Sequence, residues 1–245
     1  MPHREAFRVR SYEVDTRERL TLRALCGYLQ EAAGIHAALL GASMARLRES
    51  SLAWVLHRLR LEVEEYPRQG DLVDVVTWPS RFDRVVADRE FEVFDQGGRR
   101  LAAATSRWAV ADLRLRRPVR MPEFILQIGG EDRKAAVTLT RGELPTVSQA
   151  TTLKTFAVRR SDLDVVRHVN NTQYVGWLLE TVPDEVEAEL RPSALELLFQ
   201  REAVYGDTVT SEAQGIAGEQ GRAFAHVLRH RDAGHELVRG VTFWV

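Results

Sequence analysis

The chain has 245 residues, of which 44% are apolar and 28% are charged, and its formal net charge at pH 7 is -1. This composition is typical of a globular protein, and the balanced charge disfavours a basic protein that coats nucleic acid or anionic lipid. The single cysteine, Cys26, excludes a disulfide framework and a cysteine-rich zinc site. A charged amino terminus and the lack of a long apolar run predict a cytoplasmic protein with no membrane span.

The sequence contains two copies of one pattern. FRVRSYEVD at residues 7–15 returns as FAVRRSDLD at residues 156–164, with an offset of 149 (156 − 7). Further along, GDLVDVV at Gly70 matches GDTVTSE at Gly206 with an offset of 136 (206 − 70). The second copy is therefore 13 residues shorter (149 − 136), and we expect the shortening to lie between its helix and its sheet.

Each copy begins with an extended segment that leads into a helical pattern. In the first copy, apolar residues recur at three- and four-residue steps over residues 22–40, which predicts a helix that ends near Gly41. The remainder alternates as strands do, for example in residues 89–94. Turn residues at 95–98 and 232–234 predict hairpins.

A lone helix followed by antiparallel strands can bury its apolar stripe only by lying across one face of the sheet. Two such units predict an α+β tandem double hotdog, in which each repeat is a long helix packed on an antiparallel sheet. The two sheets are expected to pair edge to edge into one continuous sheet. The expected boundaries are an N-terminal repeat at 1–120, a connector at 121–152 and a C-terminal repeat at 153–245.

The segment SDLDVVRHVNNTQYVGWLLE at residues 161–180 resembles the acyl-ACP thioesterases, a family best known from plant plastids and also found in bacteria. Residues 29–41, 53–71 and 77–95 are similar to that family in order and spacing. The resemblance implies hydrolysis of the thioester of acyl-[acyl-carrier-protein] (acyl-ACP), which releases free fatty acid and ends chain elongation, without a cofactor or metal. The missing transit peptide suggests a bacterial member.

The resemblance also implies the catalytic residues. The family uses an Asp, an Asn two residues later, a His two beyond that, and a Glu in a following strand. By position, these roles fall on Asp164, His168 and Glu202, whereas Val166 occupies the Asn position. One amide hydrogen bond is then missing, so we expect a slower enzyme or a shifted water rather than a dead site. Ala203 stands where the family's nucleophile was once placed on a cysteine, which excludes a thiolate mechanism there.

These residue types suit thioester hydrolysis, which needs activated water and a stabilised oxyanion. Asp164 can act as general base or as nucleophile, and the sequence leaves both open. His168 can orient water or protonate the departing thiolate, and Glu202 can align the water. Backbone N–H groups at the start of the following helix can polarise the carbonyl. Further candidates for substrate or oxyanion binding are Val166, Asn170, Asn171 and His36.

The repeat predicts a single active site per chain. The first copy has these counterparts of the catalytic candidates: Asp15 for Asp164 (164 − 149), Arg19 for His168 (168 − 149) and Tyr66 for Glu202 (202 − 136). The first copy therefore lacks the full set. Its space between helix and sheet is left to hold the acyl tail, so the N-terminal repeat is predicted to be the acyl-pocket side and the C-terminal repeat the catalytic one.

Two alternative functions remain open: a hotdog thioesterase that acts on acyl-CoA, and a non-catalytic module that binds acyl groups or their carrier. A basic cluster could dock an acidic acyl carrier protein, although solvated strand-end arginines explain it equally well. The cluster consists of Arg114, Arg116, Arg117 and Arg120. No nucleic-acid or membrane partner is expected. Chain-length preference and oligomeric state, monomer or homodimer, stay undecided.

Overall fold

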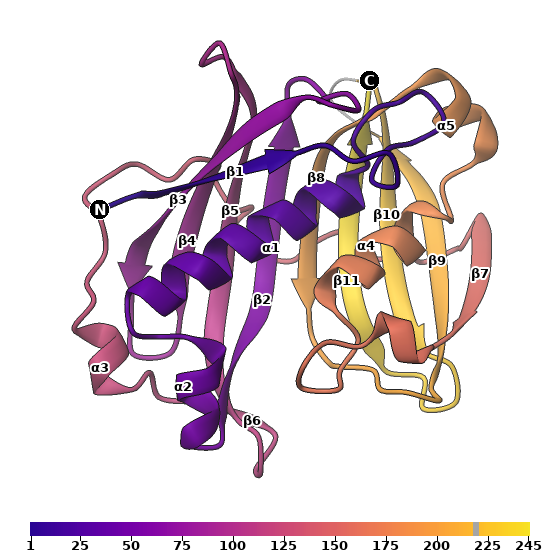
Figure 1. The fold of residues 1–245 in the computed structure, drawn as a ribbon. Coiled ribbons are helices and arrows are strands. Elements are labelled where there is room, and N and C mark those ends of the chain that lie inside the picture. Colours follow the sequence, from indigo (N-terminus) through magenta and orange to yellow (C-terminus); the bar gives the residue numbers. More distant parts are fainter. Residues whose placement is uncertain (218–220) are drawn as a thin grey trace. The chain divides into compact units, whose positions relative to one another are not determined.

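The computed structural model describes residues 1–217 and 221–245, and the chain forms two compact units, residues 1–138 and 139–245. Within the described residues, no helix is both long enough and apolar enough to cross a membrane. Figure 1 shows in each unit an antiparallel sheet with a helix across its face.

The N-terminal unit pairs its strands in the order β1-β3-β4-β5-β2, with β6 added alongside β5. Helix α1 begins after Thr21, whose hydroxyl accepts from the N–H of Ala24, and it ends ahead of Gly41, which has a φ of 75°. The predicted helix is therefore confirmed. The elements are β1 (His3–Arg8), α1 (Leu22–Leu39), α2 (Met44–Glu49), β2 (Leu52–Val63), β3 (Leu72–Phe82), β4 (Ala87–Asp95), β5 (Arg100–Asp112), β6 (Arg117–Val119) and α3 (Glu123–Leu126).

The C-terminal unit repeats this plan with the strand order β8-β11-β10-β9-β7. All of its strand pairs are antiparallel, and α4 lies over the sheet as α1 does in the first unit. The prediction of a helix packed on an antiparallel sheet in each repeat is confirmed. The elements are β7 (Thr152–Ala157), the 3-10 turn η1 (Arg160–Asp162), α4 (Asn171–Leu179), α5 (Asp184–Glu189), β8 (Pro192–Phe199), β9 (Thr208–Ala217), β10 (Arg222–His230) and β11 (Glu236–Trp244).

We expected the 13-residue shortening of the second copy to lie in the connection between helix and sheet. This expectation is wrong. Helix α1 has 18 residues and α4 has nine, while β2 has 12 residues and β8 has eight. Nine residues are thus missing from the helix and four from the strand. The connections themselves, residues 40–51 and 180–191, are equally long and each contains a six-residue helix. The C-terminal copy therefore carries a helix half as long as that of the N-terminal copy.

The sheet face opposite each helix is covered by the segment that the sequence marked as a connector. In the N-terminal unit, the buried carboxylate of Glu90 accepts from the N–H of Ala136 at 2.9 Å. In the C-terminal unit, the buried carboxylate of Glu196 accepts from the N–H and the hydroxyl of Thr140, at 3.1 and 2.6 Å. In each unit, connector groups therefore supply hydrogen bonds to a strand glutamate whose carboxylate is buried.

Candidate active site

A tight loop between η1 and α4 brings together the first group of predicted site residues. Oδ1 of Asp164 accepts the backbone N–H of Val166 at 2.9 Å and that of His168 at 3.1 Å. The N–H of Asp164 donates back to the carbonyl of His168 at 2.8 Å, and Arg167 takes a left-handed φ of 66°. The carboxylate thus organises the loop by bonding the backbone two and four residues ahead.

The first copy contains the same loop, bond for bond. Oδ1 of Asp15 accepts the N–H of Arg17 at 2.8 Å and that of Arg19 at 3.0 Å. The N–H of Asp15 donates to the carbonyl of Arg19 at 2.8 Å, and Glu18 has a φ of 60°. One oxygen of each aspartate is therefore structural, and the loop by itself is not a mark of catalysis.

The two loops differ at the other carboxylate oxygen. Oδ2 of Asp15 accepts from Nε and Nη2 of Arg19, at 2.9 and 2.8 Å. Burial would raise the pKa of Asp15, but hydrogen bonds from Arg19 and Arg17 outweigh it and lower that pKa. Across the described part of the chain, no donor contacts Oδ2 of Asp164 and no group bonds the imidazole of His168. Both side chains are partly exposed, so the second loop leaves a carboxylate oxygen and an imidazole open to solvent.

Glu202 is brought beside this loop by the backbone of the residues that follow it. The N–H of Val169 donates to the carbonyl of Ala203 at 2.9 Å, and His168 pairs with Val204 in a short antiparallel bridge. Glu202 is exposed at this junction. The backbone segments that carry the three predicted catalytic residues therefore lie side by side in the C-terminal unit, although the residues are up to 38 positions apart in sequence (202 − 164).

The start of α4 offers one unused backbone donor. Asn170 is the N-cap: its Oδ1 accepts the N–H and the hydroxyl of Thr172, at 3.0 and 2.9 Å. The N–H groups of Val169 and Asn170 are also occupied, by the carbonyls of Ala203 and Asp162. Among residues 169–172, all of which are described, the N–H of Asn171 alone has no acceptor. It is the donor at this helix terminus that could polarise a carbonyl.

Comparison with known proteins covers both units. The acyl-ACP thioesterase N-terminal domain matches residues 1–128, and the acyl-ACP thioesterase C-terminal domain matches residues 146–245. The oleoyl-acyl carrier protein thioesterase 1 of Arabidopsis thaliana is 30% identical over 100% of this chain and 76% of its own length.

The chain belongs to the acyl-ACP thioesterase family. Solved structures agree: an acyl-ACP thioesterase from Bacteroides thetaiotaomicron superposes with a TM-score of 0.87 at 26% identity, over 100% of this chain and 98% of its own. The 12:0-ACP thioesterase from Umbellularia californica superposes with a TM-score of 0.89 at 29% identity, over 100% and 94%. The predicted family, hotdog fold and thioester hydrolase class are confirmed.

His36, the remaining predicted site residue of this thioesterase, lies in the N-terminal unit on α1. Its Nδ1 accepts from Nη1 of Arg89 at 3.0 Å, and the same nitrogen of Arg89 donates to the hydroxyl of Thr77 at 3.2 Å. Burial, followed by the charge of Arg89, lowers the pKa of His36 to about 4. His36 is therefore a neutral, buried acceptor for a strand arginine rather than a group that exchanges protons near pH 7.

Tyr174 was not among the predicted site residues, yet the structure bonds it to the segment that pairs with the loop of Asp164 and His168. Its hydroxyl accepts the N–H of Ala203 at 2.9 Å, next to Glu202. The repeat offsets contained the signal, because they pair Tyr174 with Leu25 (174 − 149) and Ala203 with Pro67 (203 − 136). Neither residue of the first copy can form this bond.

The buried histidines predict that the enzyme loses stability in mild acid. Burial lowers the pKa of His226 to about 3, and that of His36 to about 4, both below the ordinary value near 6.5. Between these values the unfolded chain binds more protons than the folded one, so the free energy of unfolding falls as pH drops below about 6.5. For His226 the loss between pH 6.5 and 5 is about 2 kcal/mol. Urea denaturation at several pH values measures it.

The matched variant is His226→Leu, which removes one of the two buried imidazoles and leaves that of His36. Its absolute stability also changes because the hydroxyl of Thr242, 2.8 Å from Nε2 of His226, loses one of its two partners and keeps only the indole N–H of Trp244. The informative quantity is therefore the slope of unfolding free energy against pH, which we expect to be shallower in the variant. An unchanged slope would show that His226 does not titrate as its burial requires.

Proposed function

We propose that this enzyme hydrolyses the acyl-ACP thioester to free fatty acid, and that Asp164, His168 and Glu202 carry out the reaction in the C-terminal unit. The observation that supports this site most directly is the contrast between the two copies. Arg19 occupies Oδ2 of Asp15, whereas His168 leaves Oδ2 of Asp164 without a partner among the described residues. One repeat has kept the loop as a structural element, and the other has an oxygen available for chemistry.

The geometry supports the following proposed roles. In one route, Oδ2 of Asp164 removes a proton from a water molecule while the oxygen of that water bonds to the acyl carbon. In the other, Oδ2 itself bonds to the acyl carbon and forms an anhydride, which water then hydrolyses. In both routes the C–S bond breaks, one water is consumed, and the products are the fatty acid and the carrier thiol. The imidazole of His168 supplies the proton that the leaving sulfur takes. The N–H of Asn171 donates to the carbonyl oxygen as negative charge develops on it.

Val166 takes part in this site through its backbone alone. Its N–H holds Oδ1 of Asp164, while its side chain offers no hydrogen bond where the family has an amide. The proposed site therefore works with a carboxylate, an imidazole and a glutamate, and it lacks one polar contact to the water. The acyl tail is assigned to the N-terminal unit, whose own loop is closed by the Arg19 ion pair. The single cysteine supports a reducing compartment such as the cytoplasm.

Asp164→Asn tests the catalytic assignment. The amide oxygen can still accept the N–H groups of Val166 and His168, because asparagine forms the same kind of loop as aspartate. We expect folding to be retained and kcat/KM on acyl-ACP to fall by about 10² to 10⁴, the usual contribution of a positioned acid or base. Steady-state release of the free carrier thiol measures it.

Asp15→Asn is the matched control in the first copy. It removes the partly exposed ion pair with Arg19 and should lower the free energy of unfolding by about 0.5 kcal/mol, with kcat/KM within about twofold of the parent. Equal losses of activity in Asp15→Asn and Asp164→Asn would contradict the assignment of the site to the C-terminal unit. Full activity of Asp164→Asn would contradict the role of Oδ2.

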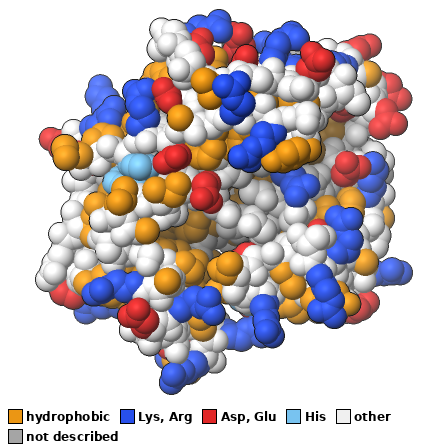
Figure 2. Space-filling view, in the orientation of Figure 1, with side chains coloured by type: hydrophobic (Ala, Val, Ile, Leu, Met, Phe, Trp, Pro, Cys, Tyr) orange, Lys and Arg blue, Asp and Glu red, His pale blue; other side chains and the backbone are white. Residues whose placement is uncertain are grey.

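We also propose that the basic cluster at the β5–β6 hairpin docks the acyl carrier protein. All four arginines are exposed, and Figure 2 shows lysine and arginine side chains along the lower margin of the view, where Figure 1 places β6. The turn does not depend on these side chains, because Oδ1 of Asp112 accepts the N–H groups of Arg114 and Leu115 at 2.7 and 2.9 Å. Such a patch attracts an acidic partner through salt-sensitive charge contacts.

The double substitution Arg114→Glu with Arg117→Glu tests the docking surface. We expect KM for acyl-ACP to rise about tenfold at low salt, with kcat little changed and the effect reduced by added salt. Activity on the acyl-CoA of equal chain length should stay within about twofold, because CoA has no acidic protein surface to dock on the patch. Arg191→Glu, at an exposed site in the C-terminal unit, is the charge control. Equal changes of KM on both substrates would count against carrier docking at this hairpin.

A further inference from the structure

The two copies also differ in the segment that is bonded to the proposed catalytic loop. The two repeats share the loop, the helix cap and the backbone bond that joins them to the next segment: Leu20 N–H to Pro67 carbonyl in the first copy, Val169 N–H to Ala203 carbonyl in the second. Only the second copy adds a bond from the N–H of residue 203 to a tyrosine hydroxyl. Proline has no N–H, so the first copy has no donor to satisfy at that position.

Ala203 is thereby held at both of its polar groups. Its carbonyl accepts from Val169 at 2.9 Å, and its N–H donates to the hydroxyl of Tyr174 at 2.9 Å. Both Ala203 and Tyr174 are buried, at 0% and 2% exposure, so neither bond competes with bulk water. Val169 follows His168 directly, and Glu202 precedes Ala203. The two bonds consequently fix the backbone of Glu202 against the loop that carries the other two catalytic residues.

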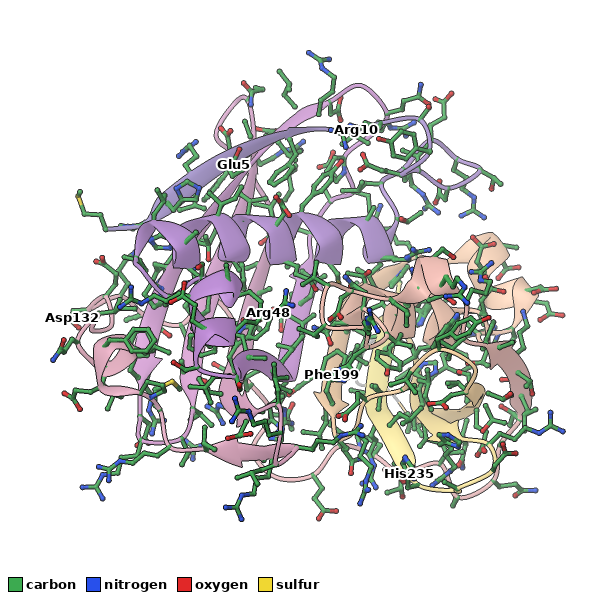
Figure 3. The ribbon with its side chains drawn as sticks, turned by 60° about the horizontal axis from the view of Figure 1, so that its bottom comes forward. Glu5, Arg10, Arg48, Asp132, Phe199 and His235 are labelled. Atoms are coloured by element: carbon green, nitrogen blue, oxygen red, sulfur yellow. The ribbon has the colours of Figure 1, made fainter. Side chains whose placement is uncertain are left out.

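The ring of Tyr174 has a separate, apolar role. It packs edge-on against Trp177 with ring centroids 5.6 Å apart, and against Phe199 at 6.2 Å. Phe199, at the end of β8, is labelled in Figure 3. These contacts do not need a hydroxyl, and Leu25 fills the equivalent buried position in the first copy without one. The hydroxyl is therefore not required for the repeat to fold.

Burial keeps the phenol of Tyr174 protonated. It is the largest cause that raises the pKa of Tyr174; the hydrogen bond from the N–H of Ala203 acts against it, and the carboxylates of Glu202, Asp207 and Asp164 raise the pKa further. A phenol that stays protonated keeps its own hydrogen while its oxygen accepts from Ala203. The same three carboxylates show that the hydroxyl lies within electrostatic reach of the acids at this end of the unit.

We propose that Tyr174 is a positioning residue, which acts through the backbone of Ala203 to hold Glu202 beside Asp164 and His168. The inference rests on the proposed function, because it takes those three residues as the catalytic set. It extends that function by naming one hydrogen bond, from the backbone N–H of Ala203 to the hydroxyl of Tyr174, that the catalytic repeat has and the other repeat lacks. Tyr174 itself need not touch the substrate.

The bond can be removed from either end. Tyr174→Phe deletes the hydroxyl and keeps the ring, while Ala203→Pro deletes the N–H and keeps the carbonyl that Val169 uses. Proline already stands at the equivalent position 67 of the first copy. We expect each variant to lower kcat about five- to tenfold, the value of one buried hydrogen bond, with KM within about twofold. The double variant should be no slower than the slower single variant, because both changes remove one interaction.

Tyr28→Phe is the matched control. Tyr28 is a buried tyrosine of the N-terminal unit, and its hydroxyl donates to Glu13 at 2.6 Å. It should lose stability on a scale similar to Tyr174→Phe and keep the parent kcat. If Ala203→Pro does not fold, the kcat of Tyr174→Phe against that of Tyr28→Phe decides alone.

The proposal is overturned if Tyr174→Phe keeps the parent kcat, or if the losses in kcat of the two single variants multiply in the double variant. Asp164→Asn, measured in the same series, separates failure of the role proposed for Tyr174 from failure of the proposed catalytic site. An active Asp164→Asn would remove the catalytic assignment. An inactive Asp164→Asn together with a fully active Tyr174→Phe would remove only the role of the tyrosine.

Discussion

An aspartate oxygen that accepts two backbone N–H groups shapes the loop on which the rest of the site depends. The bond pattern of Asp15 and Asp164 is the same, including the left-handed residue that precedes the fourth position. Because Oδ1 accepts backbone N–H groups, the carboxylate is already ordered, and Oδ2 points in a fixed direction without a further loss of conformational entropy. What stands four residues after the aspartate then decides whether that oxygen is paired or available for reaction.

The two copies illustrate how a duplicated fold can be specialised by few substitutions. An arginine at position 19 completes an ion pair and makes the first loop a closed structural element. The histidine at the equivalent position 168 makes no such pair with Asp164 among the described residues, and its imidazole is partly exposed. The accompanying changes, tyrosine to glutamate at 202 and proline to alanine at 203, alter the neighbouring segment that the loop is bonded to.

Much of the fold followed from the sequence because its signals are local. The periodic apolar residues at 22–40 and Gly41 gave the first helix nearly to the residue, and the two offsets gave the repeat. The place of the shortening did not follow. An offset measures the sum of all gaps, so it could not show that α4 stops at Leu179 and that a separate helix begins at Asp184.

For the site, residue types were predictable and contacts were not. Asn170 reads equally well as a helix cap or as a substrate ligand, and only the bond to Thr172 shows that it is occupied as a cap. The pairing of His36 with Arg89 depends on the distance between a helix and a strand 53 positions apart, which no local pattern encodes. Which oxygen of Asp164 is used by the loop likewise depends on the backbone path.

The central claim is that the unpaired Oδ2 of Asp164 and the imidazole of His168 together make the second loop catalytic, and kcat/KM of His168→Arg, which pairs the oxygen and removes the imidazole, tests it most directly. An arginine at this position should pair with Oδ2 as Arg19 does with Oδ2 of Asp15. The account predicts that kcat/KM on acyl-ACP falls by at least about 10²-fold, with a free energy of unfolding equal to or above that of the parent. A variant that folds equally well and retains the parent kcat/KM would contradict it.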